Sequence, residues 1–180
     1  MPYLRCATCG LTTFAVRAHT SAPVCPGCDQ VLEGASATEA HVNRGVDATL
    51  AMVRQVLQMD VAMVTEVDAE KEVARHVSGE WPGLGSLVGA SLPLEETFCK
   101  RMLEGAISNV VADVARDERV RDLRFARALG VGAWLGVPLP ASVARLYVLC
   151  CLAREARDVG ERDVIVLRGF AATLSSQLSE

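Results

Sequence analysis

Two Cys-x-x-Cys pairs near the start of the chain constrain its folding more than any other feature. Cys6 and Cys9 form the first pair, and Cys25 and Cys28 form the second. Each such turn can direct two sulfurs at one metal ion, and four thiolates complete the tetrahedron of a structural zinc site. A segment this short cannot bury enough apolar surface to fold unaided, so a metal ion would hold it together. We predict a zinc ribbon over residues 1–34 that binds one structural Zn²⁺ per chain.

Other uses of these cysteines fit the sequence less well. Disulfides would need an oxidising compartment, yet residues 1–4 offer neither the basic start nor the apolar stretch of a signal peptide. A thioredoxin-like redox site would need only one pair, beside a βαβ pattern. His19 could replace a thiolate, but four cysteines already fill the coordination sphere. Four thiolates leave no open position for a substrate, so we expect the ion to have a structural role.

The composition predicts a globular, soluble protein of the cytoplasm. The 180 residues are 51% hydrophobic and 22% charged, which allows one ordinary domain in addition to the zinc ribbon. We place that domain at residues 35–180, after a small and polar stretch. The most apolar run, residues 146–153, is far too short to cross a membrane, so we expect no membrane partner.

The charge distribution argues against nucleic acid as a partner. The net charge is −4, and Arg5 and Arg17 of the predicted ribbon are balanced by Asp29 and Glu33. A protein segment that binds nucleic acid usually carries a basic stripe interleaved with aromatic residues, and the sequence of the ribbon lacks this pattern. We therefore expect the ribbon to be a protein-contact segment or a structural cap rather than a DNA-binding element.

Apolar residues at heptad-like spacing predict a helix at each end of the second domain. The first helix follows a capping-box sequence, Ser36 to Glu39, and starts either near residue 37 or near residue 45. The seam residues are Val46, Leu50, Val53 and Leu57 in the first helix, and Val164, Leu167, Ala171, Leu174 and Leu178 in the last. Either each seam packs on the domain's own sheet, or part of it forms a parallel contact between two copies. We predict a homodimer.

Between these helices the pattern changes to short strands. Strand-like composition marks residues 61–67, 72–77, 133–138 and 146–152, and an acidic turn joins the first two segments. Acidic residues at 95–96 and basic residues at 100–101 predict a helix over residues 95–103. The strongly charged segment 116–129 is expected to form a solvated helix. These elements predict an α+β domain around one antiparallel sheet.

Four segments in this order resemble the GAF domain, a small-molecule sensor module of bacterial signalling proteins. They are residues 91–105, a proline-led short helix with a cysteine; 107–113, an apolar stretch ending in aspartate; 129–139, a glycine-rich entry to a strand ending in Pro-Leu; and 146–152. The resemblance covers about residues 45–178. It implies a six-stranded antiparallel sheet with the terminal helices on one face. A ligand pocket would lie on the other face, roofed by residues 95–103 and 116–129.

The resemblance places the ligand pocket among Phe98, Cys99, Asp113, Arg124 and Trp134. Cys99 is expected to be a small buried apolar residue. Some GAF photoreceptors attach a linear tetrapyrrole through a cysteine in this region, usually followed by histidine, whereas Lys100 follows here. Arg124 at the pocket mouth could attract an anionic ligand. The sequence offers no acid–base pair, so we predict no catalytic residue.

Together these features predict a cytoplasmic regulatory protein whose GAF domain binds an unidentified small molecule. We expect the signal to pass through the ribbon and the first helix to a separate output protein. One alternative is a thiol-dependent free methionine sulfoxide reductase, as in another GAF subfamily, which needs a second cysteine in the pocket. Cys150 and Cys151 point to opposite faces of one strand, so at most one could serve. Another alternative is a structural adaptor that binds no ligand.

Overall fold

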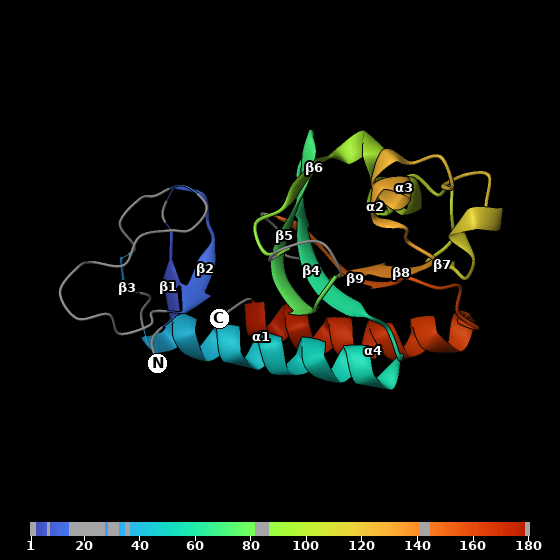
Figure 1. The fold of residues 1–180 in the computed structure, drawn as a ribbon. Helices are drawn as coiled ribbons and strands as arrows, with labels where there is room; N and C mark the ends of the chain where they lie inside the picture. Colours follow the sequence, from blue (N-terminus) through green and yellow to red (C-terminus); the bar gives the residue numbers. More distant parts are fainter. Residues whose placement is uncertain are drawn as a thin grey trace.

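The computed structural model contains two sheets, a small one from the N-terminal segment and a large one from the rest of the chain (Figure 1). It describes residues 3–6, 8–14, 28, 33–34, 37–81, 87–140 and 145–178. The large sheet has six antiparallel strands in the order β6-β5-β4-β9-β8-β7. These strands are β4 (Val61–Val67), β5 (Lys71–Gly79), β6 (Ser91–Pro93), β7 (Val110–Val111), β8 (Ala133–Pro138) and β9 (Leu146–Ala153). The expected six-stranded antiparallel sheet is therefore confirmed.

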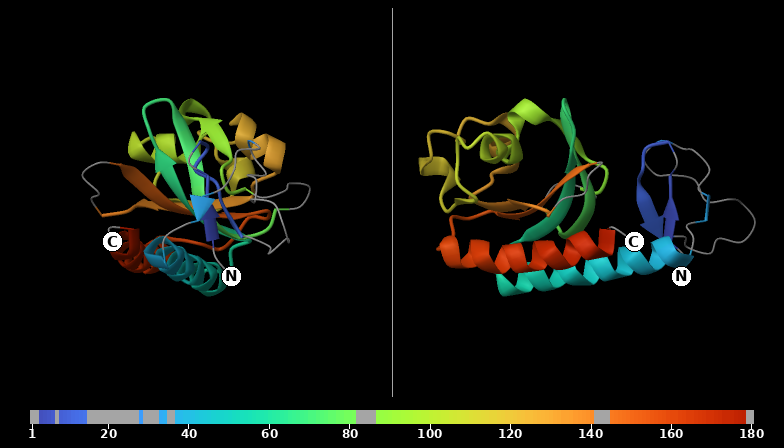
Figure 2. Two further views of the ribbon diagram at one scale, coloured as in Figure 1. Left: turned by 90° about the vertical axis from the view of Figure 1, so that its left-hand side faces the viewer. Right: turned by 180° about the vertical axis from the view of Figure 1, so that it is seen from behind.

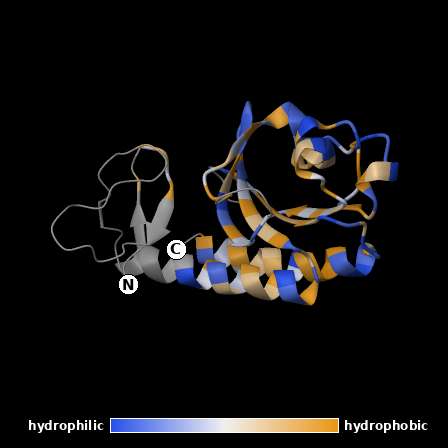
Figure 3. Cartoon of the chain, in the orientation of Figure 1, coloured by the Kyte–Doolittle hydropathy of each residue, from blue (hydrophilic) through white to orange (hydrophobic). Residues whose placement is uncertain are grey.

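The two long helices lie side by side across one face of this sheet (Figures 1 and 2). They are α1 (Ala37–Val56) and α4 (Glu161–Leu178), so the first helix starts at the earlier of the two predicted positions. Figure 3 shows that both helices carry hydrophobic and hydrophilic faces. Among the residues that the structure describes, no helix combines the length and apolarity needed to span a bilayer.

The heptad-like seams of both helices are buried in the domain's own core. Val46, Leu50 and Val53 of α1 are fully buried, and they share one apolar cluster with the α4 seam and the facing side of the strands. This is the first of the two predicted arrangements, in which each seam packs on the sheet. A residue that is buried in this way cannot contact a second copy, so any dimer contact must use other side chains of the helices.

The two faces of the sheet carry separate cores because strand side chains alternate in direction. Cys150 belongs to the cluster on the face away from the long helices, and its neighbour Cys151 belongs to the cluster under them. A register shift between β4 and β5 changes this alternation locally: Val64 pairs with His76, and Thr65 pairs with Ala74. His76 therefore belongs to the helix side, where its Nδ1 atom lies 4.0 Å from a carboxylate oxygen of Asp47 on α1.

The predicted helix over residues 95–103 is two short helices. A 3-10 turn, η1 (Leu94–Glu96), precedes α2 (Phe98–Leu103), and the extended residue Thr97 separates them with φ −110° and ψ 154°. The Thr97 hydroxyl donates to the Leu94 carbonyl at 3.0 Å and accepts from the Lys100 N–H at 3.2 Å. The hydroxyl therefore caps α2, and a threonine cap ends one turn while it starts the next.

The predicted helix over residues 116–129 is also shorter than expected. Only α3 (Arg124–Leu129) is α-helical, and η2 (Val114–Arg116) with a run of turns precedes it. The carboxylate of Asp113 caps η2 by accepting from the Arg116 N–H at 3.3 Å. The predicted acidic turn before β5 is present, since Asp68 Oδ1 accepts from two following backbone N–H groups at 2.9 and 2.8 Å.

The small sheet has the strand order β2-β1-β3. Its strands are β1 (Tyr3–Arg5), β2 (Thr12–Phe14) and β3 (Glu33–Gly34), and both pairings are antiparallel. A tight turn joins β1 to β2: Gly10 N–H donates to the Cys6 carbonyl, and Cys6 N–H donates to the Leu11 carbonyl, each at 2.8 Å. Gly10 has φ +73°, a conformation that glycine adopts without strain.

Candidate functional site

The short helices α2 and α3 cover the sheet face opposite the long helices (Figure 1). A small cavity lies between these helices and the strands. Its volume is about 50 Å³, which is enough for an ion or a few water-sized groups. The sheet contributes Met63, Thr65, Glu72, Trp134 and Cys150 to its lining, and the covering segments contribute Phe98, Cys99 and Phe125. The cavity is therefore largely apolar, with a few polar atoms brought in by neighbouring strands and α2.

Stacked aromatic rings form one wall of this cavity. The rings of Phe98 and Trp134 are nearly parallel, with centroids 5.5 Å apart and an interplanar angle of 13°. Phe125 meets Phe98 edge to face at 6.5 Å. A side chain at Gly136 would collide with the Trp134 indole, so the glycine leaves the space in which the indole lies. The stack holds α2 and α3 against β8 and fixes the size of the cavity.

The polar groups of the cavity converge on one buried carboxylate. The Cys99 thiol donates to Glu72 Oε1 at 3.1 Å, and Glu72 is only 8% exposed. The other carboxylate oxygen, Glu72 Oε2, and the hydroxyl Thr65 Oγ1 have no hydrogen-bond partner within the described part of the chain. Cys150 Sγ joins this group, and one donor atom from each of Glu72, Cys99 and Cys150 lies within 4.8 Å of the others.

The Cys99 thiol of this group is held in its protonated form. A hydrogen bond with Cys150, burial, and the charge of Glu72 together raise the pKa of Cys99 well above its usual value. Burial likewise raises the pKa of Cys151 on the opposite face of the sheet. A protonated Cys99 can donate to the carboxylate, which explains the observed hydrogen bond.

Three of the five predicted pocket residues line the cavity, and two do not. Phe98, Cys99 and Trp134 are lining residues. Asp113 caps η2 at the surface. The Arg124 side chain is 86% exposed and pairs with Glu96 at 3.2 Å. Phe125, the residue after Arg124 in α3, lines the cavity, whereas the Arg124 side chain lies in solvent.

The neighbouring arginines pair with surface carboxylates. Arg116 pairs with Asp113, and Arg121 lies between two carboxylates at 3.6 Å each. Arg119 makes a bidentate contact with Asp117, and this hydrogen-bonded carboxylate raises the pKa of the arginine. Surface pairs of this kind contribute little stability each. The paired arginines therefore form part of a solvated surface rather than an anion-binding site.

Sequence reasoning missed Glu72, Thr65 and Cys150 as cavity residues. Strand alternation indicated that Cys150 and Cys151 face opposite ways, but it did not indicate which one faces the cavity. Glu72 sits at the start of a strand, where a charged residue is usually solvated. The one sequence signal for Glu72 as a cavity residue was strand alternation, which places its side chain on the same side of the strand as Ala74, another lining residue.

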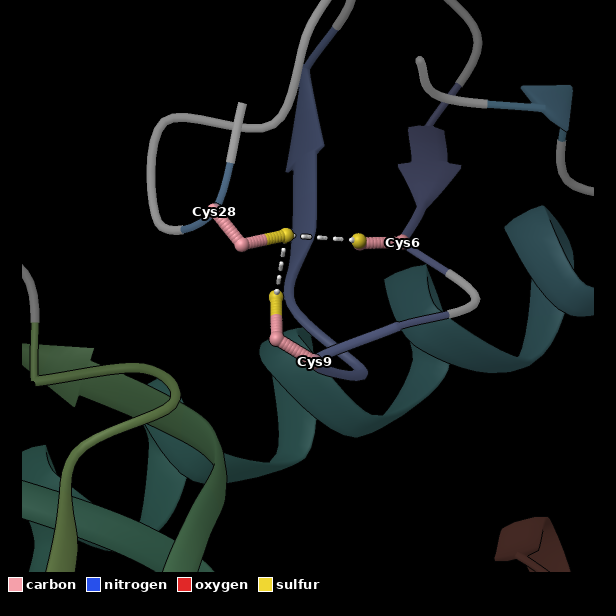
Figure 4. A group of neighbouring side chains, drawn as sticks. All are labelled: Cys6, Cys9 and Cys28. Carbon is pink, nitrogen blue, oxygen red and sulfur yellow. Dashed lines mark hydrogen bonds between the residues drawn. The ribbon is translucent and has the colours of Figure 1, made fainter. Parts of the chain in front are cut away.

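A second group of thiols lies at the turn of the small sheet, where Cys28 approaches Cys6 and Cys9 from a separate segment (Figure 4). Cys6 and Cys28 have sulfurs 3.3 Å apart, and the sulfurs of Cys28 and Cys9 are 3.6 Å apart. All three lie within 4.8 Å of one another, and Cys25, the fourth predicted ligand, is outside the described residues. A hydrogen bond from the Cys9 backbone, opposed by burial and assisted by the Cys28 side chain, lowers the pKa of Cys6 to about 6. Three converging sulfurs, one of them with a lowered pKa, suit a thiophilic metal ion.

The cysteine turn of the small sheet touches the large sheet beside the cavity. Gly10 lies against the guanidinium of Arg75, which pairs with Glu66 at 2.7 Å, and Leu11 lies against Gly89. Gly89 N–H donates to the Ala74 carbonyl at 2.8 Å. The neighbours of this contact, Ala74 and residues 87 and 90, line the cavity. A single stretch of backbone therefore separates the cavity from the cysteine turn.

Comparison with known proteins identifies the fold. A family model described as GAF domain matches residues 41–179. The GAF domain of a phosphoenolpyruvate-protein phosphotransferase from Acinetobacter is 20% identical, with a TM-score of 0.59 over 77% of this chain and 82% of that one. A phycoerythrobilin-bound GAF domain from a cyanobacterial phytochrome is 19% identical, with a TM-score of 0.60 over 79% and 90%. No curated protein sequence gives a significant match.

One similar structure is that of an enzyme. The free methionine-R-sulfoxide reductase from Neisseria meningitidis, solved in complex with its substrate, is 17% identical to this chain. Its TM-score is 0.59 over 77% of this chain and 78% of that one. At such identities these structures share the fold of this chain, and the chemistry must be judged from its own residues.

Proposed function

The chain belongs to the GAF domain family, and we propose that it is a cytoplasmic regulatory sensor that binds a small ligand and signals through a separate partner protein. One observation carries the ligand-binding part of this proposal. The cavity holds two buried oxygen atoms, Glu72 Oε2 and Thr65 Oγ1, that have no partner among the described residues. Leaving a buried polar atom unpaired costs about 1–3 kcal/mol. A ligand that supplies the missing partners would recover part of this free energy, which favours binding at this place.

The proposed role of the N-terminal segment is a zinc ribbon with one structural Zn²⁺. The converging sulfurs of Cys6, Cys9 and Cys28 support it, and Cys25 would complete the four ligands. Bound zinc would supply the stability that strands of two or three residues lack. Because four thiolates fill the coordination sphere, the ion would hold the turn in place and take no part in a reaction.

The contact between the two sheets suggests how ligand binding would reach the ribbon. Leu87 and Ala90 line the cavity on one side of this stretch, while Gly89 contacts Leu11 of the cysteine turn on the other. A ligand that bound one arrangement of this stretch more tightly would shift the position of the ribbon. An output protein that contacts the ribbon would then detect the change. This route is shorter than the predicted one along the first helix.

The proposed homodimer would use the outward face of the helix layer. Met52 and Val56 of α1 are each 55% exposed, and Ile165 and Val166 of α4 are 69% and 39% exposed. The C-terminal half of α1 and the N-terminal half of α4 lie at the same end of this layer, so the four side chains lie near one end of it (Figure 1). A second copy would bury this apolar surface.

Native mass spectrometry of the protein purified from cells tests these proposals together. The wild type is expected to be a dimer that, when it is unfolded, releases a bound molecule or ion in addition to the zinc of the proposed ribbon. Ala74→Leu fills the cavity, so it should lose the bound species and remain a dimer, because Ala74 faces away from the long helices. Val56→Glu places a charge on the exposed helix face, so it should become monomeric and keep the bound species.

Each of these variants is the control for the other. A wild type that releases nothing except the ribbon zinc, with a cavity that accepts no added ligand, would contradict the sensor and favour the structural adaptor. An unchanged mass for Val56→Glu would contradict the dimer face. Crosslinking from the ribbon in cells tests for the proposed partner protein.

A thiol-dependent sulfoxide reductase is the second candidate, and one observation favours it. Cys99 and Cys150 both line the cavity, so two thiols are available for the reaction. Cys150 is thus the one strand cysteine that the sequence allowed in the pocket beside Cys99. The reaction would convert a sulfoxide and two thiols to a thioether, a disulfide and water, and an external dithiol would then reduce the disulfide. The raised pKa of Cys99 opposes it, because the attacking group must be a thiolate.

The assay for this candidate uses free methionine sulfoxide with a thioredoxin-class dithiol as reductant. If the candidate is right, the wild type is active, and Cys99→Ser and Cys150→Ser each lose at least 100-fold in rate, which is on the order of the contribution of a positioned catalytic group. Cys151→Ser, on the other face of the strand, should retain the rate. An inactive wild type, or activity that survives both cavity substitutions, would eliminate the reductase.

A further inference from the structure

The buried Glu72, Cys99 and Cys150 form a group that the sensor and ribbon proposals leave without a defined ligand. These residues come from β5, α2 and β9, and all three are buried, at 8%, 2% and 3% exposure. Their donor atoms lie within 4.8 Å of one another. Glu72 lines the cavity, and its carboxylate oxygen Oε2 has no hydrogen-bond partner among the residues described for this chain. A carboxylate in such a place strongly favours a positively charged partner.

We propose that this group binds a thiophilic divalent cation of the zinc class, held by two thiolates and one carboxylate. The proposal names the ligand class of the cavity, and it therefore rests on the proposed sensor function. On binding, both thiols would release their protons, because the positive charge of a coordinated ion favours the thiolate form, and the ion would take the two sulfurs and a Glu72 oxygen as ligands. No electron is transferred in this step.

The spacing of the donor atoms fits such an ion. Zinc–sulfur bonds of about 2.3 Å and zinc–oxygen bonds of about 2.0–2.2 Å place tetrahedral ligand atoms roughly 3.5–3.8 Å apart. The Cys99 sulfur and Glu72 Oε1 are 3.1 Å apart, and the full group spans no more than 4.8 Å. Only small side-chain rotations separate the present arrangement from a coordinating one.

The size and softness of the site favour a metal ion over an organic ligand. The cavity volume of about 50 Å³ accommodates an ion with a water molecule but is small for an aromatic or nucleotide ligand. Two sulfurs select zinc-class ions over magnesium or calcium, which prefer oxygen ligands. Met63 lies opposite Cys150 on the neighbouring strand and adds a thioether to the same cavity.

Thr65 would complete the surroundings of the ion. Its hydroxyl is buried, lines the cavity and has no partner in the part of the chain that the structure describes. Three protein ligands leave a fourth position for water, and this hydroxyl could accept a hydrogen bond from that water. The ion and its water would thereby supply a partner for each of the two unpartnered oxygen atoms of the cavity.

The experiment counts metal ions per chain in the full-length protein. Reduced protein is stripped with a chelator and titrated with Co²⁺ alone. Elemental analysis gives the number of ions, and thiolate-to-cobalt charge-transfer absorption reports on sulfur ligands. We expect two ions per wild-type chain, one in the ribbon and one in the cavity. Cys150→Ala and Cys99→Ala should each bind one ion, and Glu72→Gln should weaken the second ion by at least about 10–100-fold.

The chain offers a matched control in Cys151. It follows Cys150 on the same strand, is equally buried and faces the opposite core, so Cys151→Ala should still bind two ions. Thermal unfolding of both alanine variants checks that any difference in metal content is not a difference in folding. Cys6→Ser should bind one ion, with the cavity ion retained.

Failure of this inference is distinguishable from failure of the proposed function. A single ion in the wild type, lost in Cys6→Ser and retained in Cys150→Ala, would overturn the cavity site. The ribbon proposal would then remain supported, and the sensor proposal would depend on a different ligand detected by native mass spectrometry. Equal loss of the second ion in Cys150→Ala and Cys151→Ala would also overturn the assignment, because it would be an effect of core packing.

Discussion

Cys28→Ser is expected to abolish zinc binding by the N-terminal segment and to unfold the small sheet while the six-stranded sheet stays folded. The strands of the small sheet have two or three residues each, so backbone pairing alone cannot hold them. In isolated zinc-finger peptides, metal binding supplies about 10–16 kcal/mol of folding free energy. Cys28 lies between the other two described sulfurs, 3.3 Å from Cys6 and 3.6 Å from Cys9. Its loss therefore removes the ligand that joins them.

Hydrogen exchange and elemental zinc analysis measure this effect. In the wild type, the amides of Cys6 and Gly10 should be protected, because both donate to backbone carbonyls in the turn. In Cys28→Ser these amides should exchange freely, whereas amides of β4 and β9 should keep their protection. Cys151→Ala is the matched control, since it removes a buried thiol far from the small sheet. Full zinc content and unchanged protection in Cys28→Ser would contradict the proposed ribbon.

Trp134→Ala is expected to lower the free energy of unfolding by about 3–5 kcal/mol. Trp134 is 1% exposed and is among the largest fully buried side chains. Its indole stacks on Phe98 at 5.5 Å and thereby ties α2 to the sheet. Removing it would lose both the apolar transfer free energy and the aromatic contact, and it would enlarge the existing cavity.

Chemical denaturation followed by circular dichroism measures this loss. Trp134→Phe keeps an aromatic ring in the wall, so it should lose less stability than Trp134→Ala. Arg116→Ala serves as a surface control, because its side chain is 89% exposed and such substitutions usually change stability by less than about 0.5 kcal/mol. A loss of under about 1 kcal/mol in Trp134→Ala would mean that the wall is not tightly packed.

Local patterns predicted the elements of the GAF domain well, because they depend on neighbouring residues. The four segments with strand-like composition are β4, β5, β8 and β9, with differences of one or two residues at some ends. The heptad-like seams marked the buried faces of α1 and α4. The break at Thr97 was missed, because its hydroxyl caps α2 through contacts that compete with the helix signal of Glu95 and Glu96.

The amino-acid sequence by itself determined the family of this chain, the succession of most strands and helices along it, and the side of each long helix that is buried. Periodicity encodes these features directly, since it records which positions meet the core. Only the tertiary structure decided what covers those positions and which distant residues meet. Glu72 and Cys99 are 27 residues apart in the sequence. Cys150 lies on β9, which does not pair with β5, the strand that carries Glu72. Their meeting depends on the order of strands in the sheet and on where α2 rests, neither of which is a property of neighbouring residues.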